Sequence, residues 1–485
     1  MYDWGTFRVL VYYIFINYNV IIGFNTNSMN DRGTEGERAS ETTPYSGNDK
    51  ALFQIGESVV IRQSSITYVT FVSIGITLLW PWNCFLSATV YYDERFSNSP
   101  HLAKIYSSSM MAIFTVTSLV YNYYLSKIQE GVDYRNRLVK GFIITFFTFL
   151  IMAFSCVMKF FVKMNDVVYF TGLMFMVVVS SISTSLSQNG AMATANLHGS
   201  LYANGVVVGQ GIAGVLPALS LIISILLAGE KTTAHANSNK KDYSVFIYYT
   251  TACLVSAISL VLVRFLRSKS PSENHYYPLG DSESIERNEA SESVFAEERQ
   301  VSFVGYDVLW SKLKFIVMSI FGAFSVSLVF PVFASKVESV HTNSSNIFFE
   351  KRMFVPVVFL MWNLGDLVGR VLCGVARSKF LIEDKQKLIK YTIYRIIFIF
   401  LLLTCNWNSR DGVNAALIKS DTWYILVQFL FGLTNGHLCA SSFMIVGDNC
   451  DTDDEKEAAS GFTTVFLSLG LVAGSIVSFF FTFFL

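Results

Sequence analysis

Eleven long apolar stretches constrain the fold of this 485-residue chain more than any other feature of its sequence. Most are about twenty residues or longer, which at 1.5 Å per residue lets a helix cross a hydrocarbon core about 30 Å thick. The sequence therefore predicts an all-α, multi-pass membrane protein with eleven transmembrane helices. The predicted spans are 68–91, 104–125, 139–161, 167–189, 202–228, 243–265, 313–334, 353–373, 388–405, 423–446 and 459–484.

The composition excludes an ordinary soluble globule. Hydrophobic residues make up 52% of the chain and charged residues 15%, with a mean hydropathy of +0.44. The net charge is zero, which gives no reason to expect a nucleic-acid polymer as a partner. The seven cysteines form no CxxC pair, which argues against a metal site. Because no hydrolase, zinc-protease or P-loop motif is present, we expect neither an enzyme nor a cofactor, and the lipid bilayer is the expected surrounding.

A polar stretch at residues 267–310, rich in Ser and Glu, lies between the sixth and seventh spans. It has too little apolar surface to bury, so we expect a disordered loop there. This loop divides the chain into an N-terminal bundle of six helices at 66–266 and a C-terminal bundle of five at 311–485. Residues 1–65 are expected to form a disordered tail, in which the role of residues 1–24 is open.

The basic residues of the connections predict the orientation of the chain. Lys and Arg are more frequent in the even-to-odd connections, such as the one with Arg135, Arg137 and Lys140, than in the opposite loops. Basic loops tend to stay in the cytoplasm, so we expect a cytoplasmic N-terminus and a lumenal or extracellular C-terminus. The sequon at Asn343 falls in a loop on the far side, which makes Asn343 a candidate glycosylation site.

The eighth span carries an acid and a base. On a helix Asn363, Asp366 and Arg370 share one face, and the two charges are i, i+4 neighbours that can pair. Gly365 and Gly369 form a GxxxG pattern beside them, which lets a second helix approach closely. A charge at the bilayer centre costs roughly 2.5 to 3.5 kcal/mol on insertion scales, so the polar face is expected to line a path. The alternative is a pair that only locks two helices together.

Other polar side chains interrupt the spans. In the first span, Trp82 and Asn83 follow a proline, and Trp82 is either a stacking surface for a planar ligand or an interfacial tryptophan at a kink. Gln188, at the end of the fourth span, can both donate and accept, as the reader of a heterocyclic base must. Asn83 of the first span, and Asn435 and His437 of the tenth, are possible cavity residues. His437 either couples protons or packs against a neighbouring helix.

Four motifs resemble those of one family, the equilibrative nucleoside transporters, in matching order over residues 66–485. The resemblance implies a fold similar to the major facilitator superfamily, with six and five helices around a central cavity and alternating access. It suggests a fungal member of an internal membrane. The motifs are Pro81-Trp82-Asn83, Gln210-Gly211-Ile212-Ala213-Gly214, Asn363-x-x-Asp366-x-x-Gly369-Arg370 and Asn435-Gly436.

The resemblance also implies roles for individual residues. Trp82 resembles the family's first-helix residue near the nucleobase, and Gln188 resembles the glutamine that reads the base. Asp366 and Arg370 resemble the pair at the ribose end, with Asn363 beside them. Either Met110 or Met111 is implied as a cavity residue of the second helix.

The sequence therefore leads to one main hypothesis of function. It is facilitative transport of nucleosides, with nucleobases as a further class, by alternating access. A proton-coupled transporter and a membrane receptor or scaffold that transports nothing are the alternatives. A vacuolar or lysosomal membrane is favoured over the plasma membrane, whereas substrate ranking and oligomeric state are left open.

Overall fold

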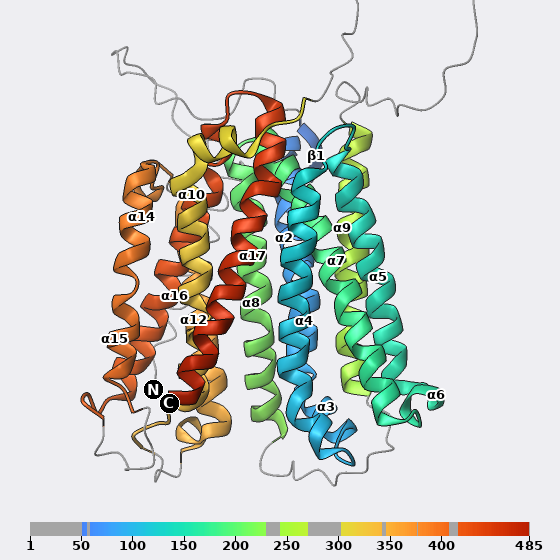
Figure 1. Ribbon diagram of the computed structural model, residues 1–485, viewed down its shortest axis with the longest axis vertical. Helices are drawn as coiled ribbons and strands as arrows, with labels where there is room; N and C mark the ends of the chain where they lie inside the picture. Colours follow the sequence, from blue (N-terminus) through green and yellow to red (C-terminus); the bar gives the residue numbers. More distant parts are fainter. Residues whose placement is uncertain are drawn as a thin grey trace, which may run out of the picture.

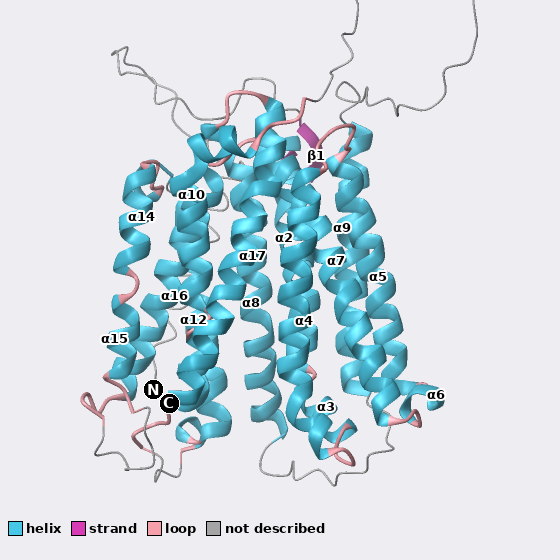
Figure 2. Cartoon of the chain, viewed as in Figure 1, coloured by secondary structure: helices cyan, strands magenta, loops and turns pink. Residues whose placement is uncertain are grey.

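The computed structural model describes residues 51–55, 59–228, 243–269, 302–341, 346–375, 377–406 and 416–484. Its long helices run side by side, with α8 and α17 in the middle of the view (Figure 1), and helix dominates the described chain (Figure 2). The long helices are α2 (Gln63–Ser87), α4 (Pro100–Lys127), α5 (Tyr134–Val157), α7 (Asp166–His198), α8 (Ser200–Ala228), α9 (Tyr243–Lys269), α10 (Tyr306–Ser327), α12 (Lys351–Val375), α16 (Asp421–Met444) and α17 (Asp453–Phe484). The shorter ones are α3 (Thr89–Arg95), α6 (Lys159–Val162), α11 (Phe330–Lys336), α13 (Arg377–Phe380), α14 (Lys385–Tyr394), α15 (Ile397–Leu403) and the 3-10 turns η3 (Ile347–Phe349) and η6 (Gly447–Asn449).

The prediction of a multi-pass helical protein is confirmed, but the count of eleven spans is not. Nine helices of the described residues are long and apolar enough to cross a membrane. The predicted ninth span is broken at Arg395 and Ile396 into α14 and α15, of 10 and 7 residues. The predicted tenth span is one helix, α16, of 24 residues. This helix is not among the nine.

Local capping explains where several of these helices begin. The side chain of Asp133 accepts from the backbone N–H of Asn136 at the start of α5, and Asn165 accepts from Val167 at the start of α7. Ser420 accepts in the same way from Trp423 at the start of α16. Each cap satisfies one of the N–H groups that a helix leaves without a partner and contributes about 1 kcal/mol.

The structure corrects part of the predicted N-terminal tail. Strands β1 (Ala51–Ile55) and β2 (Val59–Arg62) pair antiparallel, and α2 begins directly after them. Three consecutive β-branched residues, Val59, Val60 and Ile61, favour the extended conformation of β2. Residues 1–50 lie outside the described part of the chain.

Helix also takes both edges of the loop predicted at 267–310, since α9 continues to Lys269 and α10 begins at Tyr306. Most of the remaining loop, and the sequon at Asn343, lie outside the described residues. After the loop, Lys312 of α10 pairs with Asp451 and with Glu455 of α17, each at 2.6 Å. The hydrogen bond from this ammonium lowers the pKa of Asp451, which lies at the protein surface.

Candidate functional site

The site is built around an ion pair within α12. Asp366 Oδ2 accepts a hydrogen bond from Arg370 Nε at 2.6 Å, as the i, i+4 spacing predicted. Asp366 is only 4% exposed and Arg370 only 7%. Burying two charges costs several kcal/mol per ion, which close pairing and further hydrogen bonds must offset.

The other carboxylate oxygen is bound by α16. Asn435 Nδ2 donates to Asp366 Oδ1 at 2.7 Å, and Asn435 Oδ1 accepts from Ser327 Oγ of α10 at 2.6 Å. Both oxygens of the carboxylate therefore have a donor, as a buried charge requires. The structure thus brings Asn435, expected only as a possible cavity residue, into direct contact with Asp366.

The same ion pair also contacts α8. Arg370 Nη1 donates to the carbonyl oxygen of Val207 at 2.8 Å, while Asn204 Nδ2 donates to the carbonyl oxygen of Arg370 at 2.9 Å. Helix α8 belongs to the predicted N-terminal bundle, and α12 and α16 belong to the predicted C-terminal one. The ion pair therefore lies where these two groups of helices meet.

Glycines allow α12 and α16 to approach at this point. A Cβ atom on Gly365 or Gly369 of α12, or on Gly432 or Gly436 of α16, would overlap the backbone of the opposite helix. At Gly436 the overlap would be with the carbonyl oxygen of Asp366. This confirms the predicted close approach at the GxxxG pattern of α12, and it holds Asn435 within reach of the carboxylate.

Two further predicted site residues also contact α8. Gln210 Nε2 donates to Gln188 Oε1 at 2.9 Å, which joins α8 to α7. Asn83 of α2 donates through Nδ2 to the carbonyl oxygen of Ala213 at 2.7 Å. Gln188 is 9% exposed, so its side chain is largely enclosed by the protein.

Asn363 completes the set of contacts on α8. Its Oδ1 lies so near Gly214 that a Cβ atom there would be 2.6 Å away, and its Nδ2 donates to the carbonyl oxygen of Phe359 at 2.8 Å. A larger residue than glycine at position 214 would require the Asn363 amide to move. Residues 207–214 of α8 thus contact predicted site residues from α2, α7 and α12.

Trp82 lies in a more apolar environment. Its ring is half-buried, and its centroid is 4.3 Å from that of Phe114 with 34° between the planes. Met110 is buried in the apolar cluster against which Trp82 packs, whereas Met111 is half-buried. Of the two methionines left open by the sequence, Met110 is the one that shares this cluster.

His437 does not join the network around Asp366. Its Nε2 is 2.7 Å from the carbonyl oxygen of Phe380, and its ring packs edge-on against Tyr391 with 5.7 Å between centroids. These contacts hold α16 against α13 and α14. The packing alternative for this histidine therefore fits its surroundings.

Arg395, at the break between α14 and α15, was not among the predicted site residues. Arg395 is 1% exposed, and its Nε and Nη1 have no hydrogen-bond partner among the described residues. Its Nη2 lies 3.5 Å from Ser327 Oγ, the hydroxyl that donates to Asn435. A charged residue inside a predicted span is itself a signal of function. Arg395 lies within the predicted span 388–405, so this rule alone would have identified it.

The arrangement suits a neutral, hydroxyl-rich solute with a planar part. A carboxylate accepts and a guanidinium donates to hydroxyl groups, and an amide pair and a tryptophan lie on helices packed around the same stretch of α8. Among the described residues, no three His, Cys, Asp or Glu side chains gather as metal ligands. In this conformation the ion pair is closed off from solvent.

Comparison with solved structures identifies the fold class. The proton:xylose symporter XylE of the major facilitator superfamily superposes with a TM-score of 0.57 and 12% identity, covering 86% of this chain and 88% of that one. The transporter FucP of the same superfamily gives 0.52 and 11%, covering 86% and 91%. The protein therefore has the fold of this transporter superfamily, as the resemblance implied.

Sequence comparison then gives the family. The family model described as nucleoside transporter matches residues 174–483, so the chain belongs to the nucleoside transporter family. The nucleoside transporter FUN26 of Saccharomyces cerevisiae is 36% identical, over 87% of this chain and 85% of that protein. Equilibrative nucleoside transporter 1 of Homo sapiens is 24% identical, over 85% and 96%.

Proposed function

We propose that this protein carries nucleosides across a membrane down their concentration gradient, by alternating access. The observation that carries the proposal is the Asp366–Arg370 pair, which contacts α8 on one side and α16 on the other. Membership of the nucleoside transporter family and the names of its relatives support the same substrate class. Nucleobases, which lack the ribose, are the further class proposed.

The proposed mechanism uses the hydrogen bonds that cross between the two groups of helices. Arg370 binds the carbonyl oxygen of Val207, and Asn204 binds that of Arg370, so any rocking of α8 against α12 must exchange these bonds. Ribose hydroxyls are suitable replacements, because they can donate to Asp366 and accept from Arg370. The nucleobase then lies toward Gln188 and Trp82.

Flux into vesicles tests this proposal. Purified full-length protein in liposomes should take up labelled uridine until the internal and external concentrations are equal, and Asp366→Asn should lower the rate. Asp166→Asn is the matched control, because Asp166 forms an ion pair with the buried Arg95, and both residues are far along the chain from the site. No uridine uptake above empty liposomes, with a folded protein, would reject the proposal.

Uptake should not depend on an imposed pH gradient. Asp366 is already paired and His437 bonds a backbone carbonyl away from it, so neither contact provides an obvious proton-coupling element. Uridine accumulation driven by a pH gradient would favour the proton-coupled alternative. Transport rather than catalysis is the activity proposed, and a receptor or scaffold would give no flux.

We place the protein in an internal membrane, vacuolar or lysosomal, with the N-terminus in the cytoplasm and the C-terminus in the lumen. The distribution of Lys and Arg in the connections supports the orientation. Microscopy of a fluorescently tagged chain tests the location, and protease protection of tags at each end tests the orientation. Labelling confined to the plasma membrane would contradict the first.

A further inference from the structure

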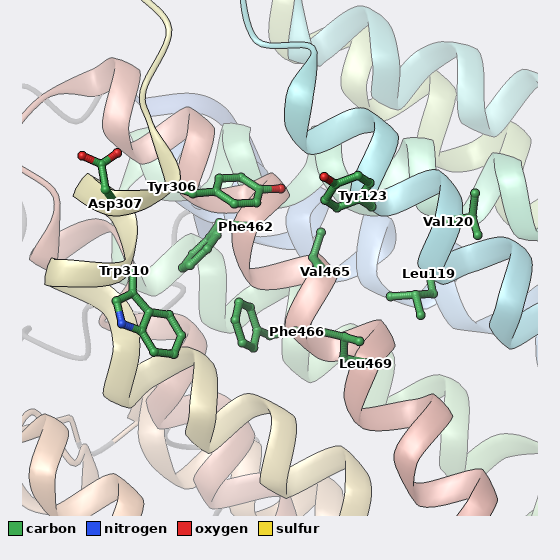
Figure 3. A pocket seen from close by; sticks show the side chains of 10 residues that line it. All are labelled: Leu119, Val120, Tyr123, Tyr306, Asp307, Trp310, Phe462, Val465, Phe466 and Leu469. Carbon is green, nitrogen blue, oxygen red and sulfur yellow. The ribbon is translucent and has the colours of Figure 1, made fainter.

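An apolar groove lies on the side of the helix bundle, between α4, α10 and α17 (Figure 3). Its volume is about 680 Å³, within the range of roughly 300 to 1,000 Å³ found for sites that take drug-sized ligands. Helix α17 forms its floor, and α4 and α10 form its two walls (Figure 3). The lining residues are Leu119, Val120, Tyr123, Tyr306, Asp307, Trp310, Phe462, Val465, Phe466 and Leu469.

The groove opens outward rather than into the bundle. The exposed fractions of Val120, Tyr123 and Trp310 are 64%, 52% and 44%. All three residues are on helices that are candidate membrane spans, so the medium outside the groove is lipid. The occupant must therefore come from the bilayer.

The polar groups of the groove gather at one end, where α4 ends and α10 begins. Lys127 Nζ lies 3.8 Å from the centroid of the Tyr306 ring and 5.6 Å from that of Tyr123, in a cation–π arrangement. The Tyr306 hydroxyl bonds Ser126. The Asp307 carboxylate lies at the edge of the same end and points away from the rings (Figure 3).

The rest of the groove is aromatic and aliphatic. On α17, Phe462, Val465, Phe466 and Leu469 follow i, i+3, i+4, i+7 spacing and so form one continuous face. The Trp310 ring stacks on Phe466, with 29° between the planes and 5.9 Å between centroids. This wall and floor make a continuous apolar surface of rings and branched side chains, which suits a rigid apolar ligand.

We propose that this groove binds a membrane sterol, with its hydroxyl at the Tyr123 end and its ring system along α17. One end of the groove carries one cation and one anion, so its charge is balanced. A single uncharged hydroxyl matches that end. The phosphate of an anionic phospholipid would instead be repelled by the carboxylate of Asp307. A flexible acyl chain would also lose more conformational freedom than a fused ring system does.

The sequence of α4 fits the same ligand. Val120, Tyr123 and Lys127 follow a short pattern proposed for sterol contact, an aliphatic residue, then tyrosine, then a basic residue. The pattern is too short to be informative by itself. Here, however, its aliphatic and tyrosine residues line the groove, and its lysine lies against two of the groove's aromatic rings.

The groove spans helices of both predicted bundles. Asn122 of α4, between the lining residues Val120 and Tyr123 in the sequence, donates through Nδ2 to Ser468 Oγ of α17 at 2.7 Å. A sterol that contacts α4 and α17 together stabilises the arrangement in which these helices are joined. The ligand is thus expected to raise the thermal stability of this conformation.

Photolabelling of the full-length protein in lipid nanodiscs tests the proposal, with a cholesterol analogue that carries a diazirine and an alkyne. Labelled peptides should come from α4, α10 and α17, and excess cholesterol should compete. Leu469→Trp, which fills the groove, should lower labelling about tenfold, and Tyr123→Phe, which removes one hydroxyl, about fivefold. Val261→Trp, on the exposed face of α9, is the matched control and should label like the wild type.

Three results would overturn the proposal. They are equal labelling of Leu469→Trp and the wild type, competition by phosphatidylserine as strong as that by cholesterol, or labelling spread evenly over the exposed helices. Tyr123→Phe keeps the test decisive if Leu469→Trp does not fold, because it changes one exposed hydroxyl. The readout is sterol binding, so the result does not depend on whether uridine is transported.

Discussion

Two aspartate–arginine pairs among the described residues have the same length but different surroundings. Arg95 Nη1 bonds Asp166 Oδ1 at 2.6 Å, and its Nη2 donates to the carbonyl oxygen of Met164. The partners of this pair come from α3, α7 and the residues beside them, all within the predicted N-terminal bundle. The Asp366–Arg370 pair, also at 2.6 Å, bonds α16 through Asn435 and α8 through Val207.

The difference separates a pair that holds one part of the chain together from a pair that joins two parts. The hydrogen bonds around Asp166 need not change when the two groups of helices move. Those around Asp366 and Arg370 must change when α8 moves against α12. We therefore expect loss of either pair to reduce stability. Only loss of the Asp366–Arg370 pair should also change substrate binding and transport.

The largest effect is expected from Asp366→Ala. It leaves the buried Arg370 guanidinium without its carboxylate, which costs about 3 to 5 kcal/mol. Asp166→Ala should cost less, because the Asp166 side chain is 17% exposed, against 5% for that of Asp366. Thermal unfolding in detergent and uridine flux per folded molecule check both variants. Equal losses of uridine flux in the two folded variants would contradict the proposed difference between the two ion pairs.

Two of the buried arginines, Arg370 and Arg395, should also differ in their effect on stability. Arg370→Met leaves Asp366 unpaired and should cost about 3 to 5 kcal/mol, whereas Arg395→Met removes a guanidinium with two nitrogens that have no partner among the described residues. We expect Arg395→Met to leave the unfolding temperature unchanged or to raise it. A large loss of stability in Arg395→Met would contradict this reading of the break between α14 and α15.

A smaller effect is expected from Gly436→Ala. The added methyl group would overlap the carbonyl oxygen of Asp366, and overpacking of this kind costs about 1 to 3 kcal/mol. It should also draw Asn435 away from the carboxylate and lower uridine flux. Gly172→Ala is the control, since a Cβ atom there meets nothing within 4 Å. Identical unfolding temperatures for the two variants would show that α12 and α16 are not closely packed.

The smallest effect is expected from His437→Gln. Glutamine keeps a donor for the carbonyl oxygen of Phe380, so the change should cost about 0.5 kcal/mol or less. Uridine flux measured from pH 5 to pH 8 should keep the same profile as in the wild type. A flattened profile in the variant would assign proton coupling to this histidine after all.

The sequence predicted what depends on spacing within one helix. The shared face of Asn363, Asp366 and Arg370 and the close approach at Gly365 and Gly369 follow from helical periodicity, and the structure has both. The partners of these residues could not be predicted in this way. No regular spacing relates Val207 to Arg370, or Ser327 to Asn435, because these contacts depend on how separate helices pack.

The break between α14 and α15 shows a second limit. Neither Pro nor Gly occurs near Arg395 and Ile396 to signal an interruption, and the apolar run around them is typical of one continuous span. The prediction of one continuous ninth span therefore missed both the helix break and the buried charge of Arg395. A hairpin at Ala51–Ile55 and Val59–Arg62 was missed for a related reason, since two short strands are a weak signal beside a polar tail.

The most direct test of the central claim is the ratio of the affinities for uridine and 2′,3′-dideoxyuridine, which lacks both ribose hydroxyls. Wild-type protein should prefer uridine by about tenfold or more, as expected for hydrogen bonds to charged groups. Asp366→Asn should bring the ratio close to one, while Asp166→Asn should keep it. A folded Asp366→Asn protein that retains the wild-type preference would contradict the claim that this ion pair binds the sugar.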